Sequence, residues 1–280
     1  MTTPQPSAML DQSAPTSVRR PTALITGASG GLGEEMARQL APRGIHLLLV
    51  ARREDKLQAL AAELAEKHGI QTGVMALDLA DPGAAAELER EAEFRRIDID
   101  FLINNAGYGL YGEFAHSDRT EQLDMLQLNI VTLTELTHRF LPGMLSRGRG
   151  RIMNVASTAA FLPGPLMATY YASKAFVLSF SEGLAEELRG SGVAVTALCP
   201  GPVETGFQDR ASLGESVMLS GPSRFSVLSA QDVARQGLEA MMRGDAVCIP
   251  GGVNRAQLLM TKLMPRKYLP RLIHNVQRRK

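Results

Sequence analysis

The sequence predicts one α/β domain built on a doubly wound, seven-stranded parallel sheet with helices on both faces. From Thr22 onward, short apolar runs alternate with longer segments of helical periodicity, which is the pattern of repeated βαβ units. Hydrophobic residues make up 45% of the 280 residues and charged residues 21%, so the chain can bury a core without disulfides or metals. We therefore expect a single domain over residues 21–250.

The predicted elements alternate along this domain. Strands are expected over residues 22–26, 46–51, 72–78, 99–104, 151–157, 194–199 and 246–250. Helices are expected over residues 32–42, 54–68, 84–94, 120–145, 169–189 and 231–242. Leu and Ala recur at helical spacing between charged residues in the second helix, as expected of a helix on the outside of a sheet.

Three segments do not follow this alternation. Residues 1–20 are rich in Pro, Ser, Thr and Gln, which predicts a disordered leader rather than a signal peptide. Residues 205–229 are polar and aperiodic, as in a loop that closes over a substrate or in a disordered loop. Residues 251–280 contain eight Lys or Arg and no acidic residue. This basic amphipathic extension could touch an anionic membrane weakly, pack over the substrate opening or contact another subunit.

Charge and cysteine content limit the possible partners and the compartment. A net charge of +1 argues against nucleic-acid binding. Cys199 and Cys248 each lie in an apolar, strand-like run without a CxxC or Cys/His cluster, so we expect free buried thiols and no metal site. The sequence contains no run of about 18 apolar residues, which is the length that would indicate a membrane span. These features predict a cytoplasmic protein, at most peripherally attached to a membrane.

A glycine-rich turn follows the first predicted strand and opens the first helix. Its sequence is Thr-Gly-Ala-Ser-Gly-Gly-Leu-Gly. Glycine allows a tight turn and the close approach of a pyrophosphate, and the helix N-terminus offers unpaired N–H groups. The candidate cofactor-binding residues in this turn are Thr26, Gly27, Ser29, Gly31, Leu32 and Gly33.

Further cofactor-binding candidates follow strands two, three and four. Arg52 and Arg53 occupy the place where a carboxylate would bind the ribose hydroxyls of NADH. Guanidinium groups would instead pair with a 2′-phosphate, which favours NADP(H) over NAD(H), unless both are simply solvated at a helix start. Asp78, followed by Leu79, could bind the adenine amino group or cap the next helix. The Asn-Asn-Ala-Gly run adds Asn105, Ala106 and Gly107.

The candidate proton chemistry lies where the fifth strand ends and the next long helix begins. Tyr170 and Lys174 are one helical turn apart, so both can face one cleft. A nearby positive charge lowers the pKa of a tyrosine from its usual value of about 10. Ser157 could hold a substrate oxygen beside the phenol. Tyr171 is a rival phenol, roughly on the same face of the helix.

Together these motifs resemble those of the classical short-chain dehydrogenase/reductase family over residues 22–250. The matching residues are the glycine motif, Asp78, the Asn-Asn-Ala-Gly run, Asn129 in Leu-Asn-Ile, Ser157, Tyr170 with Lys174, and the segment from Pro200 to Thr205. The resemblance implies a Rossmann-like sheet and hydride transfer to a carbonyl carbon, with Tyr170 as the general acid and base. It favours Tyr170 over Tyr171.

The resemblance also implies roles for the remaining site residues. Lys174 would hold the nicotinamide ribose, Ser157 would orient the substrate, and Asn129 would anchor a water molecule in a proton relay. The residues expected to flank the nicotinamide are Pro200, Gly201, Val203 and Thr205. Members of the family form homodimers or homotetramers, and we expect the same here.

The substrate is expected to be a small hydrophobic carbonyl compound or alcohol. The pocket walls predicted from the sequence are Tyr108, Tyr111, Phe161, Leu162 and the loop from Phe207 to Phe225. These walls are apolar, which favours a ketone, an aldehyde or an acyl chain over a charged sugar acid. The rival function is a non-catalytic NADP(H)-sensing binding protein on the same fold.

Overall fold

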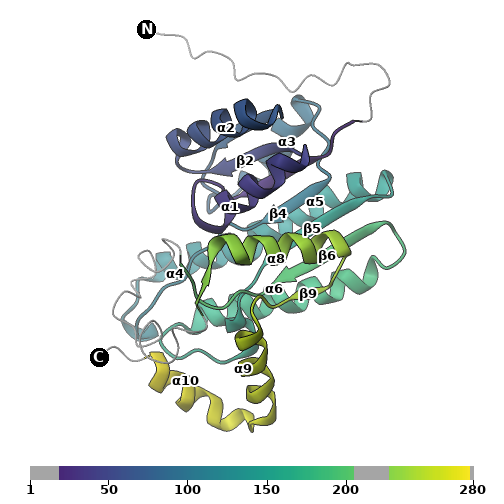
Figure 1. The fold of residues 1–280 in the computed structure, drawn as a ribbon. Helices are drawn as coiled ribbons and strands as arrows, with labels where there is room; N and C mark the ends of the chain where they lie inside the picture. Colours follow the sequence, from purple (N-terminus) through teal and green to yellow (C-terminus); the bar gives the residue numbers. More distant parts are fainter. Residues whose placement is uncertain (1–18, 205–226, 278–280) are drawn as a thin grey trace.

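Seven parallel strands form the central sheet, in the order β3-β2-β1-β4-β5-β6-β9 (Figure 1). The computed structural model describes residues 19–204 and 227–277. The strands are β1 Thr22–Thr26, β2 His46–Ala51, β3 Thr72–Ala76, β4 Phe101–Asn104, β5 Gly150–Val155, β6 Val193–Leu198 and β9 Val247–Cys248. The strand order reverses between β1 and β4, so the chain leaves these strands in opposite directions and opens a crevice at their carboxyl ends.

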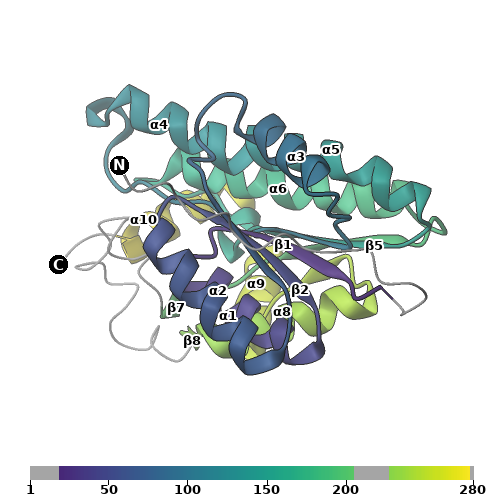
Figure 2. The ribbon, with the colours of Figure 1, turned by 90° about the horizontal axis from the view of Figure 1, so that it is seen from above.

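Helices cover both faces of this sheet (Figure 2). One face carries α1 Gly31–Leu40, α2 Glu54–His68 and α8 Ala230–Arg243, and the other carries α3 Ala84–Phe94, α4 Arg119–Leu126, α5 Leu133–Ser146 and α6 Ala168–Glu187. Successive residues of a strand point in turn to the two faces of the sheet and pack against the helices on that face. Ile25 belongs to one core cluster and its neighbour Leu24 to the other, and both are fully buried. The strands therefore consist of continuous apolar runs.

The sequence-based boundaries agree closely with the structure at the start of the chain and less well later. The elements β1, β2, α2 and α3 match to the residue. The strand β3 ends two residues before Asp78, and β9 has only two residues. The helix predicted over 120–145 is divided, because a π-helix, Gln127–Thr132, joins α4 to α5. Short 3-10 turns occupy Ala41–Arg43, Phe114–His116 and Thr158–Phe161.

A small parallel pair forms beside the sheet where the predicted lid begins and ends. The strand β7, Val203–Glu204, pairs with β8, Leu228–Ser229. Residues 205–226, which form most of the predicted lid, lie outside the described residues, as do residues 1–18 of the predicted leader.

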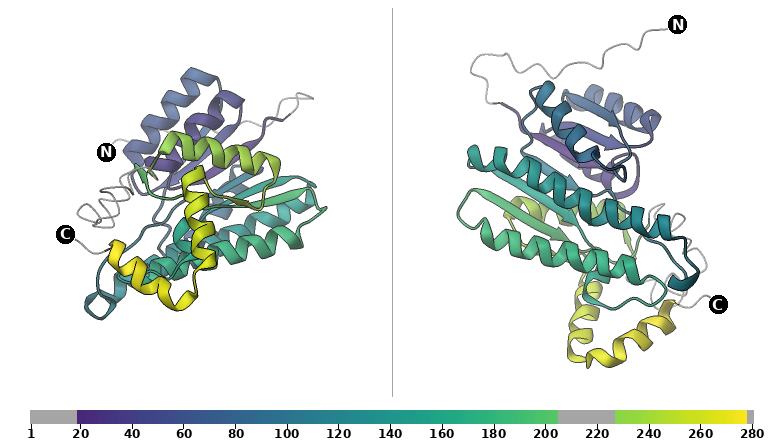
Figure 3. Two further views of the ribbon diagram at one scale, coloured as in Figure 1. Left: turned by 60° about the horizontal axis from the view of Figure 1, so that its bottom comes forward. Right: turned by 180° about the vertical axis from the view of Figure 1, so that it is seen from behind.

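The chain continues beyond the sheet into two further helices. These are α9 Gly252–Leu263 and α10 Leu269–Gln277, joined by a 3-10 turn at Arg266–Tyr268. They project from the body beneath the carboxyl ends of the strands (Figures 1 and 3). No helix within the described ranges is long and apolar enough to cross a membrane.

Candidate active site

A cavity of about 1220 Å³ follows the carboxyl ends of the strands. It extends from the glycine-rich turn after β1 to Tyr170 on α6 and on to the inner side of α9 and α10. Every strand from β1 to β6 contributes residues from the loop that follows it. The cavity therefore occupies the crevice that the reversal of strand order predicts.

The glycine-rich turn is shaped by contacts that leave no room for side chains. A Cβ atom on Gly33 would lie 2.5 Å from the carbonyl oxygen of Gly27, and one on Gly27, whose φ is +67°, would lie 2.8 Å from Asn105 Nδ2. Thr26 Oγ1 fastens this turn to the end of β4 by accepting hydrogen bonds from the backbone N–H groups of Asn105 and Ala106, both at 2.9 Å.

The helix α1 begins at this turn without a side-chain cap. Its first backbone N–H groups remain available to an anion, and the positive end of the helix dipole lies at the cavity wall. The turn thus fits the pyrophosphate of a dinucleotide.

The arginines after β2 lie on either side of the next part of the cavity. Arg53 extends over the glycine-rich turn, where its Nη2 donates hydrogen bonds to the Ser29 carbonyl at 2.8 Å and to the Ser29 hydroxyl at 3.1 Å. Arg52 pairs with Asp78 at 3.2 Å. Asp78 also accepts a hydrogen bond from the backbone N–H of Ala80. It does not cap α3, whose N-cap is Gly83.

The reacting groups come from β5 and α6. Ser157, just beyond β5, hydrogen-bonds the phenol of Tyr170. Lys174 Nζ donates a 2.8 Å hydrogen bond to the Val155 carbonyl and lies 5.8 Å from the centre of the Tyr170 ring. Tyr170 and Lys174 are both buried, so a phenol, a hydroxyl and an ammonium share one enclosed wall of the cavity.

Burial controls the protonation of both groups. Desolvation raises the pKa of Tyr170 to about 12, against the opposing effect of its hydrogen bond from Ser157. Desolvation also lowers the pKa of Lys174 to about 8, against the opposing effect of Cys199. The cost of burying the phenolate therefore exceeds the effect of Ser157, and the lowering of the Tyr170 pKa by Lys174 and an oxidised nicotinamide stays a prediction. At neutral pH the phenol is therefore protonated.

Asn129 supports the site from behind the cavity wall. It lies within the π-helix and is 1% exposed. Its Nδ2 donates to the Tyr108 carbonyl at 2.9 Å and to the Ser173 hydroxyl at 3.1 Å, and its Oδ1 accepts from the Tyr108 N–H at 3.2 Å. These contacts fix the backbone after β4. Its role as the anchor of a water molecule stays a prediction.

A family model described as short chain dehydrogenase matches residues 21–216. The chain belongs to the short-chain dehydrogenase family. The classical short-chain dehydrogenase/reductase family and the Rossmann-like fold predicted from the sequence are thereby confirmed, and so is membership of a family of NAD(P)-binding oxidoreductases.

Individual relatives agree with this placement. This chain is 35% identical over 219 residues to a very-long-chain 3-oxoacyl-CoA reductase of Phaeosphaeria nodorum, an alignment that covers 77% of this chain and 64% of the relative. This chain spans only about half to two thirds of the length of these curated relatives.

Two solved structures are similar over nearly their whole length. One is a short-chain dehydrogenase from Sphingobium yanoikuyae in complex with NADPH, at 34% identity and a TM-score of 0.77, covering 87% of this chain and 93% of that one. The other is an alcohol dehydrogenase from Comamonas testosteroni specific for bulky-bulky ketones, at 30% identity and a TM-score of 0.72, covering 89% and 99%.

Most of the site residues predicted from the sequence line the cavity of the dehydrogenase. They are Gly27, Ser29, Gly31, Leu32, Arg52, Arg53, Asp78, Leu79, Asn105, Ala106, Gly107, Ser157, Tyr170, Lys174, Pro200, Gly201 and Val203. Thr26, Gly33 and Asn129 do not line it and instead shape the loops that do. Thr205 lies outside the described residues, as does the loop from Phe207 to Phe225.

The substrate wall differs from the one predicted. Tyr108 and Leu162 line the cavity, whereas Phe161 packs into the core, and Tyr111 instead holds the end of α10. The sequence analysis did not identify the individual residues that α9 and α10 contribute, which are Asn254, Gln257, Leu258, Thr261, Leu272, Ile273 and Gln277. Of its three interpretations of the extension, the structure supports packing over the substrate opening. The helical spacing of the apolar residues in this extension is the signal by which the sequence could have identified its cavity-facing side.

Proposed function

We propose that this short-chain dehydrogenase reduces a hydrophobic ketone or aldehyde to an alcohol, with Tyr170 as the proton donor. One observation supports this most directly: a buried, protonated phenol, hydrogen-bonded by Ser157, faces the same cavity as the glycine-rich turn. Bound NADPH would supply the hydride. Ser157 and Tyr170 hydrogen-bond the carbonyl oxygen and polarise it, and Tyr170 transfers its proton as charge develops on that oxygen.

Lys174 has two roles in this proposal. At neutral pH it carries a positive charge, because its pKa of about 8 lies above that pH. This charge lies 5.8 Å from the Tyr170 ring and stabilises the phenolate that remains after proton transfer. The hydrogen bond from Nζ to the Val155 carbonyl fixes the side chain at the wall of the cavity, where it would hold the nicotinamide ribose of a bound cofactor.

We also propose that the cofactor is NADP(H) rather than NAD(H). Arg53 lies over the turn with its guanidinium on Ser29, so a 2′-phosphate there would meet both a cation and a hydroxyl. Together with Arg52 and Arg53, Lys56 is a third cation that lines the cavity. The relative from Sphingobium yanoikuyae was solved with NADPH.

The substrate class follows from the walls beyond Tyr170. These are largely apolar and include Tyr108, Leu162, Met167, Leu258, Leu272 and Ile273. Such a surface favours a bulky apolar carbonyl compound, and the names of the relatives agree with that class. A non-catalytic NADP(H) sensor is less well supported, because a sensor has no need of a protonated phenol held between Ser157 and Lys174.

We further infer the setting in which the protein works. Cys199 and Cys248 are buried free thiols, which suits the cytoplasm. Exposed apolar and basic side chains on α9 and α10 suit weak contact with an anionic membrane. We expect a homodimer or homotetramer and no nucleic-acid partner.

The deciding experiment measures oxidation of NADPH and of NADH over a panel of ketones, aldehydes and 3-oxoacyl thioesters. We expect NADPH to be oxidised faster, and Tyr170→Phe to lower kcat about 10²–10⁴-fold. The rival phenol provides the control, because Tyr171→Phe should lose far less. A variant pair with the opposite order would overturn the assignment, and NADPH binding without turnover of any carbonyl would favour the sensor.

A further inference from the structure

The side chain of Gln277 is buried at the end of α10, against the catalytic helix. Gln277 is 0% exposed and lines the cavity. Its Nε2 donates a 2.5 Å hydrogen bond to the phenol oxygen of Tyr171, and its main-chain carbonyl accepts a 2.8 Å hydrogen bond from Tyr111. Tyr171 follows Tyr170 directly, and the two rings pack edge to face with their centres 6.1 Å apart. A polar group thus lies close to the proton donor.

This contact leaves polar atoms at the cavity without partners. Gln277 Oε1 is buried and accepts no hydrogen bond from any described residue. The phenol oxygen of Tyr171 accepts from Gln277, and no described residue is recorded as accepting the phenol hydrogen. Buried polar atoms are almost always paired in folded proteins, so an acceptor and a donor side by side indicate a ligand.

The orientation of the amide decides what the ligand must supply. If the amide is turned by 180°, Oε1 accepts the phenol hydrogen and Nε2 becomes an unpaired donor. Either orientation leaves one amide atom without a partner among the described residues, and the observed one, with Nε2 donating to Tyr171, calls for a donor on the ligand. Burial raises the pKa of Tyr171, so at neutral pH its phenol is protonated.

Docking of α10 does not depend on the amide. The helix is already held by the hydrogen bond from Tyr111 to the main chain and by buried Leu269. The neighbouring helix α9 is held by Leu258 and by Asn254, whose Nδ2 donates to the Pro250 carbonyl. An apolar side chain at position 277 would fill the same space, but it would leave the Tyr171 phenol without this partner. The glutamine pairs with the phenol and places one unpaired polar atom at the cavity, which a ligand can satisfy.

We propose that Gln277 and Tyr171 form a second recognition point of the substrate site, for a hydroxyl or amide N–H that the substrate carries in addition to its reacting carbonyl. This inference rests on the proposed carbonyl reduction. A hydroxyl group accepts from the Tyr171 phenol and donates to Gln277 Oε1, so it satisfies both atoms. A second carbonyl satisfies only the donor, and a methyl group satisfies neither. The preferred substrates are therefore hydrophobic ketones that carry such a donor.

The test compares pairs of bulky phenyl ketones that differ by one hydroxyl group, placed at increasing distance from the carbonyl. The quantity measured is the ratio of kcat/KM for the hydroxylated ketone to that for the plain one. We expect a ratio above one for the wild type at the matching position, and a fall of about tenfold in Gln277→Leu. A third set, in which a carboxamide replaces the hydroxyl, distinguishes the two kinds of donor.

Asn275→Leu is the matched control, because Asn275 is an exposed residue of the same helix. It should keep the wild-type ratio. Equal losses on both ketones in Gln277→Leu would assign the residue a structural role and overturn the proposal. An unchanged ratio, or a wild-type enzyme without preference for any hydroxylated ketone, would also overturn it.

A binding measurement separates this inference from the proposed function. The product alcohols of the same ketones, with and without the second hydroxyl, are added to NADP⁺-saturated protein and the Tm is measured. We expect the second hydroxyl to raise the Tm more in the wild type than in Gln277→Leu. If the second hydroxyl raises the Tm more in the wild type than in Gln277→Leu but no ketone is reduced, only the carbonyl reduction is contradicted. If ketones are reduced but neither the kcat/KM ratio nor the Tm shift differs between the two proteins, only the recognition point is contradicted.

Discussion

Tyr170 and Lys174 are both less easily ionised than the same residues in water. Each is almost fully enclosed, and the enclosure keeps the phenol protonated while it weakens the charge on the amine. The sequence predicted that these two side chains would meet, because four residues in a helix is a local spacing. It could not predict which effect would control the pKa of Tyr170, because burial depends on the whole fold.

The ionisation of Lys174 predicts how stability changes with pH. Its pKa falls from 10.5 to about 8 on folding, so between these values the unfolded chain binds more protons than the folded one. The free energy of unfolding therefore gains a contribution as the pH rises through this window, about 3 kcal/mol at most. Below pH 8 the buried charge is a constant cost, and above about pH 10.5 the cost is gone.

Urea unfolding of the wild type and of Lys174→Met between pH 7 and pH 10.5 checks this prediction. We expect the stability advantage of the variant to shrink as the pH rises. The raised pKa values of Tyr170, Cys199 and Cys248 act in the opposite direction at high pH, but they are common to both proteins and largely cancel in the difference. A constant difference across the range would contradict the prediction.

At the scale of elements, hydrophobic periodicity did not predict the π-helix between α4 and α5. Strands and outer helices were predicted well because the strands are short continuous apolar runs and the outer helices bury a face that repeats every 3.6 residues. The wider turn at Gln127–Thr132 carries two polar side chains that reach neighbouring loops. Asn129 bonds the backbone of Tyr108, and Thr132 donates to the Leu79 carbonyl at 2.7 Å. Such non-local partners cannot be inferred from a repeat.

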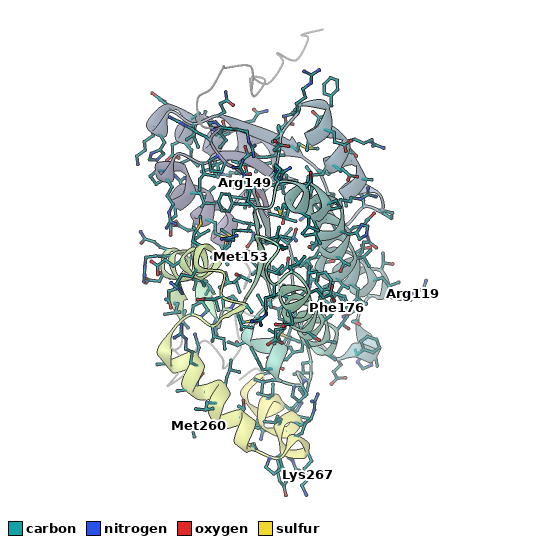
Figure 4. All side chains as sticks on the ribbon, turned by 90° about the vertical axis from the view of Figure 1, so that its right-hand side faces the viewer. Arg119, Arg149, Met153, Phe176, Met260 and Lys267 are labelled. Carbon is teal, nitrogen blue, oxygen red and sulfur yellow. The ribbon has the colours of Figure 1, made fainter. Side chains whose placement is uncertain are left out.

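We predict that Asn129→Ala destabilises the protein by about 3 kcal/mol, because it leaves the N–H and carbonyl groups of Tyr108 buried without their partner. Arg119→Ala is the control, since Arg119 is an exposed residue at the start of α4 (Figure 4). Urea denaturation should show a clearly lower midpoint for the first variant only. Equal midpoints would mean that the contacts of Asn129 carry little stability.

At the scale of the whole molecule, the C-terminal extension presents two different surfaces. Its inner side closes the cavity through Leu258 and Gln277. Its outer side exposes large apolar and basic side chains, among them Met260 and Lys267 (Figure 4). The exposed apolar residues that do not line the cavity are Val253, Leu259, Met260, Met264 and Tyr268. The sequence indicated the amphipathic character of this segment, but its docking depends on non-local contacts such as the hydrogen bond from Tyr111 to the main chain of Gln277, across 166 positions.

Membrane contact through this outer surface makes a direct prediction. Intact protein should float with anionic vesicles at low salt and less at high salt, because the basic residues act through screened charge. The double variant Leu259→Glu/Met260→Glu should remain in the soluble fraction, since both side chains are more than 60% exposed and would place negative charge at the lipid surface.

The control for flotation is Phe94→Glu on α3, where an equally exposed aromatic lies outside the extension. It should float like the wild type. Equal flotation of all three proteins, or of none of them, would rule out the extension as a membrane contact.

The contact between Gln277 and Tyr171 also has a consequence for synthesis on the ribosome. A nascent chain that has emerged as far as Pro250 already contains all seven strands, the glycine-rich turn and Tyr170, and domains fold as the chain emerges. At that stage the dinucleotide crevice can form, but the reacting end is still open to water. We therefore expect the proposed reacting end to close only after the sheet has folded, when residues 251–277 have been released and packed.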